Sequence, residues 1–131
     1  MKTLTLSLKK KWYDMIASGE KTEEYREIKT FWINRLLTWF DGHSIGKYYD
    51  STFPISTTVK KDLIDTMIDW RKIDFVTFTL GYPKKGDMSR RMTFRVNRIT
   101  IDTGRLEWGA MPTRLYFVIK LGERIQGRDR V

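Results

Sequence analysis

The residues best suited to chemistry lie between positions 19 and 26, where a glycine, two cations and a carboxylate occur close together. They are Gly19, Lys21, Glu24 and Arg26. A carboxylate held between two cations can accept hydrogen bonds from a hydroxyl or from the amino group of a base, while the cations bind phosphate. The same residues on an open strand would form only a surface ion pair, which contributes little. Spacing alone leaves both alternatives open.

The elements around this segment indicate how it is positioned. Leucines alternate with polar residues over 3–8, which predicts a half-buried strand. The apolar spacing that follows predicts a short helix, and Gly19 suits the position after a helix, where φ is positive. Residues 22–28 are predicted to form a strand. Because side chains alternate between the two faces of a strand, Glu24 and Arg26 would share one face about 7 Å apart.

The middle of the chain is predicted to contain two helices and a loop. Apolar residues follow helical spacing over residues 33–40, and a helix that stops at Asp41-Gly42 is expected there. Residues 42–56 are expected to form an aromatic loop. A further helix is expected from about residue 57 through Ile68.

The C-terminal half is predicted to be mainly β structure. Residues 73–80 are rich in Phe, Val and Thr, and a Gly-Tyr-Pro break separates them from a polar, basic loop over 84–91. The strand that follows changes its apolar parity near 97–98, which predicts a bulge or a bend. A final strand is expected over 115–121, ended by Gly122. This order of elements predicts one α+β domain built on a curved sheet or small barrel.

Length and composition are those of one folded domain. The chain has 131 residues, of which 40% are apolar and 14% aromatic, and its mean hydropathy is −0.48. No run approaches the roughly 20 apolar residues of a membrane helix, and the first residues lack the apolar core of a signal peptide. No membrane association is therefore expected, and a cytoplasmic location is predicted. With no cysteine and a single histidine, His43, neither a metal site nor a cofactor is expected.

Positive charge is concentrated in the second half of the chain. Residues 1–65 carry 11 basic and 9 acidic side chains, whereas residues 66–131 carry 14 and 7. Ten of those 14 cations are arginines, whose planar guanidinium groups bind phosphates and stack on bases. The net charge of +9 favours a polyanionic partner, with an ordinary basic surface as the alternative.

Two further groups of residues could contact a nucleic acid. Four cations surround the predicted loop and could bind phosphates: Lys84, Lys85, Arg90 and Arg91. Tyr25 and Tyr82 lie beside basic residues and could stack on bases. The alternative is a solvated hairpin loop. Neither a Walker loop nor a GxGxxG motif is present, so nothing indicates nucleoside triphosphate chemistry.

The segment Gly19–Arg26 resembles the signature GxKxxExR of the ASCH family, in the PUA-like superfamily, and matches it at all four positions. Three later segments are also similar to small ASCH proteins of bacteria and phages: residues 75–82, 107–110 and 116–125. The resemblance implies one ASCH-like domain over residues 1–131, with a helical or loop insertion at about 31–70. The implied fold is a PUA-like small curved β-barrel flanked by helices.

The resemblance also implies a ligand, because the family is proposed to bind RNA. The signature residues would gather in a cleft that takes RNA or a nucleotide. Lys21 and Arg26 would hold phosphate or ribose, and Glu24 would accept hydrogen bonds from a base edge.

An enzymatic branch of the family supplies the alternative. Some compact ASCH proteins are similar to amidohydrolases that act on acylated cytidines, or are linked to RNA cleavage. In the amidohydrolases the lysine matching Lys21 is catalytic and works with a threonine three residues later and a carboxylate from a later strand. This chain has Glu24 at the threonine position, which removes the hydroxyl and favours binding over catalysis. A small hydrolase using Lys21 and Glu24 stays the alternative, and a protein-interaction adaptor using residues 42–56 is the second.

Overall fold

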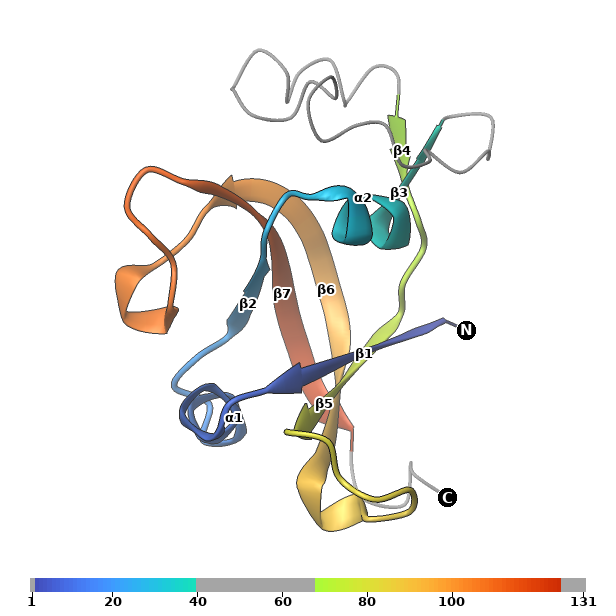
Figure 1. The fold of residues 1–131 in the computed structure, drawn as a ribbon, viewed down its shortest axis with the longest axis vertical. Coiled ribbons are helices and arrows are strands. Elements are labelled where there is room, and N and C mark those ends of the chain that lie inside the picture. Colours follow the sequence, from blue (N-terminus) through green and yellow to red (C-terminus); the bar gives the residue numbers. More distant parts are fainter. Residues whose placement is uncertain (1, 40–67, 126–131) are drawn as a thin grey trace. The chain divides into compact units, whose positions relative to one another are not determined.

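A computed structural model describes residues 2–39 and 68–125 (Figure 1). Within them the protein is α+β, with a curled five-stranded sheet and two α-helices. In chain order the elements are β1 (Thr3–Leu8), α1 (Lys10–Ala17), β2 (Glu23–Arg26), α2 (Thr30–Leu36), β3 (Leu37–Trp39), β4 (Ile68–Trp70), β5 (Phe75–Leu80), the 3-10 turn η1 (Met88–Arg90), β6 (Arg91–Thr103), the 3-10 turn η2 (Leu106–Trp108) and β7 (Leu115–Ile125). The α+β class and the curved sheet agree with the prediction from sequence.

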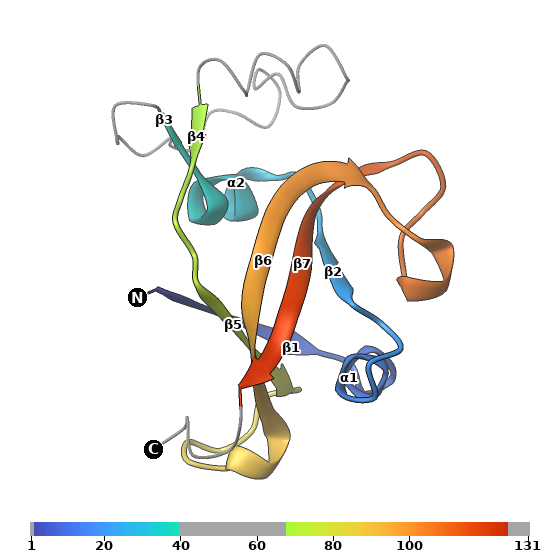
Figure 2. The same ribbon diagram turned by 180° about the vertical axis from the view of Figure 1, so that it is seen from behind.

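The sheets are ordered by their backbone hydrogen bonds. The five-stranded sheet runs β1-β5-β6-β7-β2, and β3 pairs with β4 in a separate two-stranded sheet (Figure 2). β1 and β5 are parallel from Thr3 opposite Phe75 to Leu8 opposite Leu80. β5 and β6 are antiparallel.

The described residues form two compact units, and the first consists of residues 2–24, 73–99 and 119–125. The alternating leucines of β1 are buried, as their two-residue period requires. The apolar face of α1 and the inward residues of β5 and β6 complete the core. Its buried members include Leu4, Leu6, Leu8, Tyr13, Ile16, Val76, Phe78, Met92, Phe94 and Ile119.

The second unit consists of residues 25–39, 68–72 and 100–118. Its core combines α2, β3 and the adjoining parts of β6 and β7, and Trp70 packs edge-on against Phe117 with ring centroids 6.0 Å apart. The buried members include Ile33, Leu36, Leu37, Ile101, Ala110, Tyr116, Phe117 and Val118.

The helix expected over residues 33–40 is wrong in its second half. α2 ends at Leu36, and Leu37 has extended backbone angles, φ −123° and ψ 158°. Leu37 instead pairs with Trp70 in the β3–β4 ladder. Apolar residues at 33, 36 and 37 satisfy a helical stripe, but Leu37 is equally buried as a strand residue. Ile68, expected in a helix, is likewise the first residue of β4.

Three strand boundaries also differ from the prediction. β2 covers only Glu23–Arg26, and Arg91 begins β6 rather than ending the loop. Gly122 does not end the last strand, which continues to Ile125. A Cβ at Gly122 would meet the end of the Asn97 side chain on β6, the neighbouring strand. β6 is continuous through 97–98, while its buried residues do change parity, from Met92 and Phe94 to Ile101.

Several predictions fall on residues that the structure does not describe. The aromatic loop at 42–56 and the start of the helix near residue 57 both lie outside the described ranges. The single domain over residues 1–131 and the insertion at about 31–70 therefore stay predictions. No helix of the described ranges is long and apolar enough to cross a membrane.

Candidate functional site

The turn between α1 and β2 brings Lys21 and Glu24 together. Gly19 has φ +86°, so the chain leaves the helix in a conformation that glycine adopts easily. The amide of Lys21 then donates to the carbonyl of Met15 at 3.0 Å, which folds the chain back against the helix end. As a result the ammonium of Lys21 lies 2.8 Å from Oε1 of Glu24.

This ion pair is buried within the first unit. The side chains of Lys21 and Glu24 are 3% and 7% exposed. The Lys21 ammonium also lies 4.6 Å from the ring centroid of Trp12, close enough for a cation–π interaction. Burying two charges is costly unless they are paired. The pair is therefore a tightly held group that fixes the start of β2, and solvent reaches little of it.

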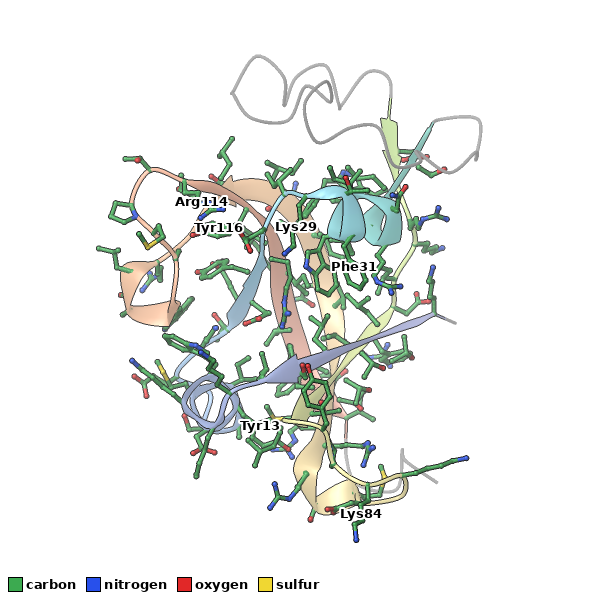
Figure 3. All side chains as sticks on the ribbon, in the orientation of Figure 1. Tyr13, Lys29, Phe31, Lys84, Arg114 and Tyr116 are labelled. Atoms are coloured by element: carbon green, nitrogen blue, oxygen red, sulfur yellow. The ribbon has the colours of Figure 1, made fainter. Side chains whose placement is uncertain are left out.

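Tyr25 and Arg26 belong to the second unit, where both already have protein contacts. The Tyr25 hydroxyl accepts a hydrogen bond from the amide of Arg105 at 3.0 Å, and its ring packs against Tyr116 (labelled in Figure 3) at 5.8 Å. The Arg26 guanidinium lies 5.1 Å from the ring centroid of Trp32. Tyr25 thus secures the residues before η2, in addition to any role in binding.

The predicted basic residues meet in the first unit at residues 81–90, here called the basic loop, and at Arg91, the first residue of β6. An open hollow of about 390 Å³ lies at its base, lined by Leu80, Gly81, Tyr82, Pro83, Lys84, Asp87 and Arg90. Tyr82 is 93% exposed, so nearly its whole ring faces solvent. Lys84, labelled on this loop in Figure 3, and Arg90 supply cations to the wall. Lys85 is exposed on the same loop but does not line the hollow.

The basic loop is held in shape by its own hydrogen bonds. Oδ1 of Asp87 accepts from the amide of Ser89 at 3.1 Å and from its hydroxyl at 2.5 Å. Nη1 of Arg91 donates to the carbonyl oxygens of Lys84 and Asp87, at 3.1 and 2.5 Å. Gly86, with φ +88°, makes the intervening turn. Arg91, at the start of β6, therefore braces the loop through its carbonyl groups, whereas Lys84 and Arg90 line the hollow.

Asp87 of the basic loop and Tyr13 of α1 have shifted pKa values. The hydrogen bonds from the side chain and amide of Ser89, together with the charges of Arg90 and Arg91, lower the pKa of Asp87 below its ordinary value of 3.8. Burial raises the pKa of Tyr13 above 10.0 and outweighs the opposing charge of Arg124. The negative charge of Asp87 also raises the pKa of Tyr13, so the Tyr13 phenol on α1 and the carboxylate of the basic loop interact electrostatically.

Two of these residues were not among the sites expected from sequence. Trp12 carries no local sign that it would lie over Lys21, since the contact depends on the turn at Gly19. Asp87 did carry a signal: an aspartate two residues before a serine, directly after a glycine, is typical of a capped turn. Within residues 2–39 and 68–125, no group of three His, Asp or Glu side chains is arranged to hold a metal ion.

Comparisons with protein-family models, with curated proteins and with solved structures found no match to this chain. The ASCH resemblance and the PUA-like architecture therefore stay predictions.

Proposed function

We propose that this chain is a single-stranded RNA-binding module of the ASCH type with a PUA-like fold, and that RNA contacts the basic loop. The observation that carries the proposal is Tyr82, a ring that is 93% exposed beside a hollow walled by Lys84 and Arg90. Proteins that bind single strands combine an aromatic surface for the bases with cations for the backbone.

The chemistry of the basic loop suits such a ligand. An exposed tyrosine offers a face on which any base can stack, worth about 1–3 kcal/mol per base. Lys84, Lys85 and Arg90 are exposed and can exchange their counterions for phosphates without disturbing the fold. The braces from Asp87 and Arg91 hold the loop in one shape before the ligand arrives, which lowers the entropy lost on binding.

The signature residues have a different part in this proposal. Lys21 and Glu24 form a buried ion pair, so their main role in this proposal is to hold the turn between α1 and β2. Their direct contact with a base or phosphate, and that of Arg26, is what the family resemblance implies. The hydrolase alternative gains no observation of its own, because the Lys21 ammonium is held by Glu24 rather than presented to a substrate.

The test is binding of a fluorescently labelled single-stranded RNA, followed by anisotropy at low salt. Tyr82→Ala should weaken binding by about 5- to 150-fold, the equivalent of one lost stacking contact, while Tyr82→Phe keeps the ring and should bind normally. Lys84→Ala should weaken binding as well.

Lys2→Ala is the matched control for charge. Lys2 precedes the first pair of the β1–β5 ladder, whereas the basic loop follows the last pair, about 20 Å away along the strands. Both substitutions remove one exposed lysine, but only Lys84→Ala should have a large effect. No binding at low salt, or equal losses in Lys84→Ala and Lys2→Ala with none in Tyr82→Ala, would refute the proposal.

A further inference from the structure

We propose that an RNA held at the basic loop continues across the outer face of β1, β5 and β6, where the hydroxyl groups of Thr77 and Thr93 and the guanidinium of Arg95 bind its backbone. The outer face is the side of these three strands opposite the buried leucines of β1. The inference rests on the proposed function, because it concerns an RNA already bound at the basic loop, and it adds a second contact surface to that site.

The strand period and the pairing registers build this face. Side chains in β1, β5 and β6 alternate between the core and the outer face. Because paired residues of neighbouring strands point to the same side, the outer side chains form three rows. Counted from the basic loop, the rows are Ser7, Thr79 and Arg91; Thr5, Thr77 and Thr93; and Thr3, Phe75 and Arg95. The face is therefore rich in hydroxyl groups, and β6 carries an arginine at each end of it.

The basic loop is anchored on the same face. In the first row the Thr79 hydroxyl donates to the carbonyl of Gly81 at 2.8 Å. Nη1 of Arg91 in that row donates to the carbonyl oxygens of Lys84 and Asp87. Two outer-face side chains thus hold carbonyl groups of the loop, so the loop folds toward the outer face. An RNA strand that leaves the hollow in the direction of the sheet meets the second and third rows next.

The second row presents a hydrogen-bond donor. The hydroxyl oxygens of Thr77 and Thr93 lie 2.8 Å apart and share a hydrogen bond. Each hydroxyl has one proton, so the shared bond uses one of the two and the other can donate to a ligand. Thr5, exposed on β1, adds a further hydroxyl to this row. Phosphate oxygens accept from threonine hydroxyls, and the ribose 2′-hydroxyl can donate or accept.

The third row supplies a cation. Arg95 lies about 13 Å along β6 from Arg91. Its guanidinium is 5.2 Å from the ring centroid of Phe75, which keeps the charge against the sheet. Nε of Arg95 also pairs with Glu123 at 3.1 Å, but both side chains are more than half exposed. An exposed pair of this kind contributes little, so a phosphate can replace the glutamate. A polyanion crossing the face therefore meets hydroxyl donors and then a second cation.

The experiment measures binding of labelled oligouridine of about three and about ten nucleotides over a series of salt concentrations, lengths below and within the range of common single-strand sites. Only the longer strand can reach from the hollow to the third row. Arg95→Gln should reduce the slope of log K against log salt by about 0.7 for the longer strand, the loss of one phosphate contact, and leave the shorter strand unchanged. Thr77→Val combined with Thr93→Val should weaken the longer strand alone, by about twofold to tenfold.

Arg105→Gln is the matched control for Arg95→Gln. Arg105 is likewise exposed, lies 4.7 Å from the ring centroid of Trp108 and pairs at 3.5 Å with a glutamate two residues later. It belongs to the second unit and not to the outer face, so Arg105→Gln should leave both slopes unchanged. Lys2→Ala also stays a control. Lys2 is one residue before Thr3, so its side chain points away from the outer face.

The outcomes separate this inference from the proposed function. An unchanged slope in Arg95→Gln, an equal loss in Arg105→Gln, or a loss that is the same for both strand lengths would overturn the second contact surface and leave RNA binding at the basic loop intact. Normal binding by the double valine variant would overturn the role of the hydroxyl groups. Failure of both strands to bind the native chain would overturn the inference and the proposed function together.

Two further measurements accompany the comparison. Thermal unfolding of each variant shows that it is folded before its affinities are compared. Sedimentation of the native chain without RNA tests the other possible occupant of the outer face. A dimer that Arg95→Gln dissociates would assign the face to a second copy of the chain and overturn the inference.

Discussion

Lys21 and Glu24 illustrate at the scale of single residues how burial changes the meaning of a charged motif. On a surface strand this pair would contribute little, but at 3% and 7% exposure each charge depends on the other. Trp12 adds a cation–π contact to the lysine. The pair is therefore required by the local fold, whatever ligand the chain binds.

Lys21→Met should lower the free energy of unfolding by about 3–5 kcal/mol, because it removes the cation that lies 2.8 Å from the buried Glu24 carboxylate. Adding Glu24→Leu should reverse the loss and can stabilise by about 1–4 kcal/mol relative to the native chain, since neither charge of this buried pair is left. Urea unfolding of the two variants measures both effects.

The control for that pair is Lys10→Met, which breaks the exposed pair of Lys10 with Asp14 in α1. It should cost less than about 1 kcal/mol. A loss from Lys21→Met as small as the loss from Lys10→Met would mean that the buried pair contributes no more than a surface one.

Asp87 should titrate below 3.8, because the hydrogen bonds from Ser89 stabilise its carboxylate and hold its pKa down. Its contribution to loop stability is present above the ordinary pKa and is lost as the pH falls through the lowered value. The chemical shift of the Ser89 amide, followed by NMR during an acid titration, reports the midpoint.

Ser89→Ala removes the largest cause of the shift and should move the Asp87 midpoint up toward 3.8. In the Ser89→Ala variant, NMR follows the chemical shift of the Asp87 side chain during the acid titration, in place of the residue 89 amide. A native midpoint at or above 3.8 would show that the turn is not held by these bonds in solution.

At the scale of elements, close approaches between segments decide which glycines are required. A Cβ at Gly104 would lie 2.7 Å from both the Ala110 Cβ and the Tyr25 ring, atoms that cannot move aside easily. A Cβ at Gly122 would meet the end of the Asn97 side chain, which is exposed and can rotate away. Only Gly104 is therefore required by packing, and the residues immediately around either glycine do not reveal this difference.

Gly104→Ala should therefore lower the free energy of unfolding by about 1–3 kcal/mol through overpacking beside Tyr25. Gly122→Ala, inside β7, should change it by less than about 0.5 kcal/mol, because only Asn97 has to adjust. Thermal or urea unfolding of the two variants measures the difference. Equal effects in the two variants would show that the contacts around Gly104 relax more readily than their geometry indicates.

At the scale of the whole molecule, the net charge of +9 bears on the RNA experiments. Any chain this basic binds polyanions weakly through its overall field, so affinity at low salt does not by itself identify a site. The salt dependence does: log K should fall with log salt by about 0.7 for each phosphate contact, and Lys84→Ala should reduce that slope while Lys2→Ala should not.

The sequence by itself determined the features that act over a few residues. Alternating leucines gave β1 its inward face, Gly19 ended α1 with a positive φ, and the residues after Leu80 formed a basic loop. These signals are reliable because side-chain period and backbone sterics operate locally. Glu24 lies three positions after Lys21, so the pairing of these two residues is also a local feature of the sequence.

The tertiary structure decided whatever depends on residues far apart in the chain. Leu37 is a strand residue because it pairs with Trp70, and Gly122 lies inside β7, which is paired with β6 and β2 in the five-stranded sheet. Burial, too, is set by the packing of several elements, so the sequence could not tell an exposed motif at Lys21 and Glu24 from an enclosed one. Local patterns specify which conformations the chain can adopt, and distant contacts select among them.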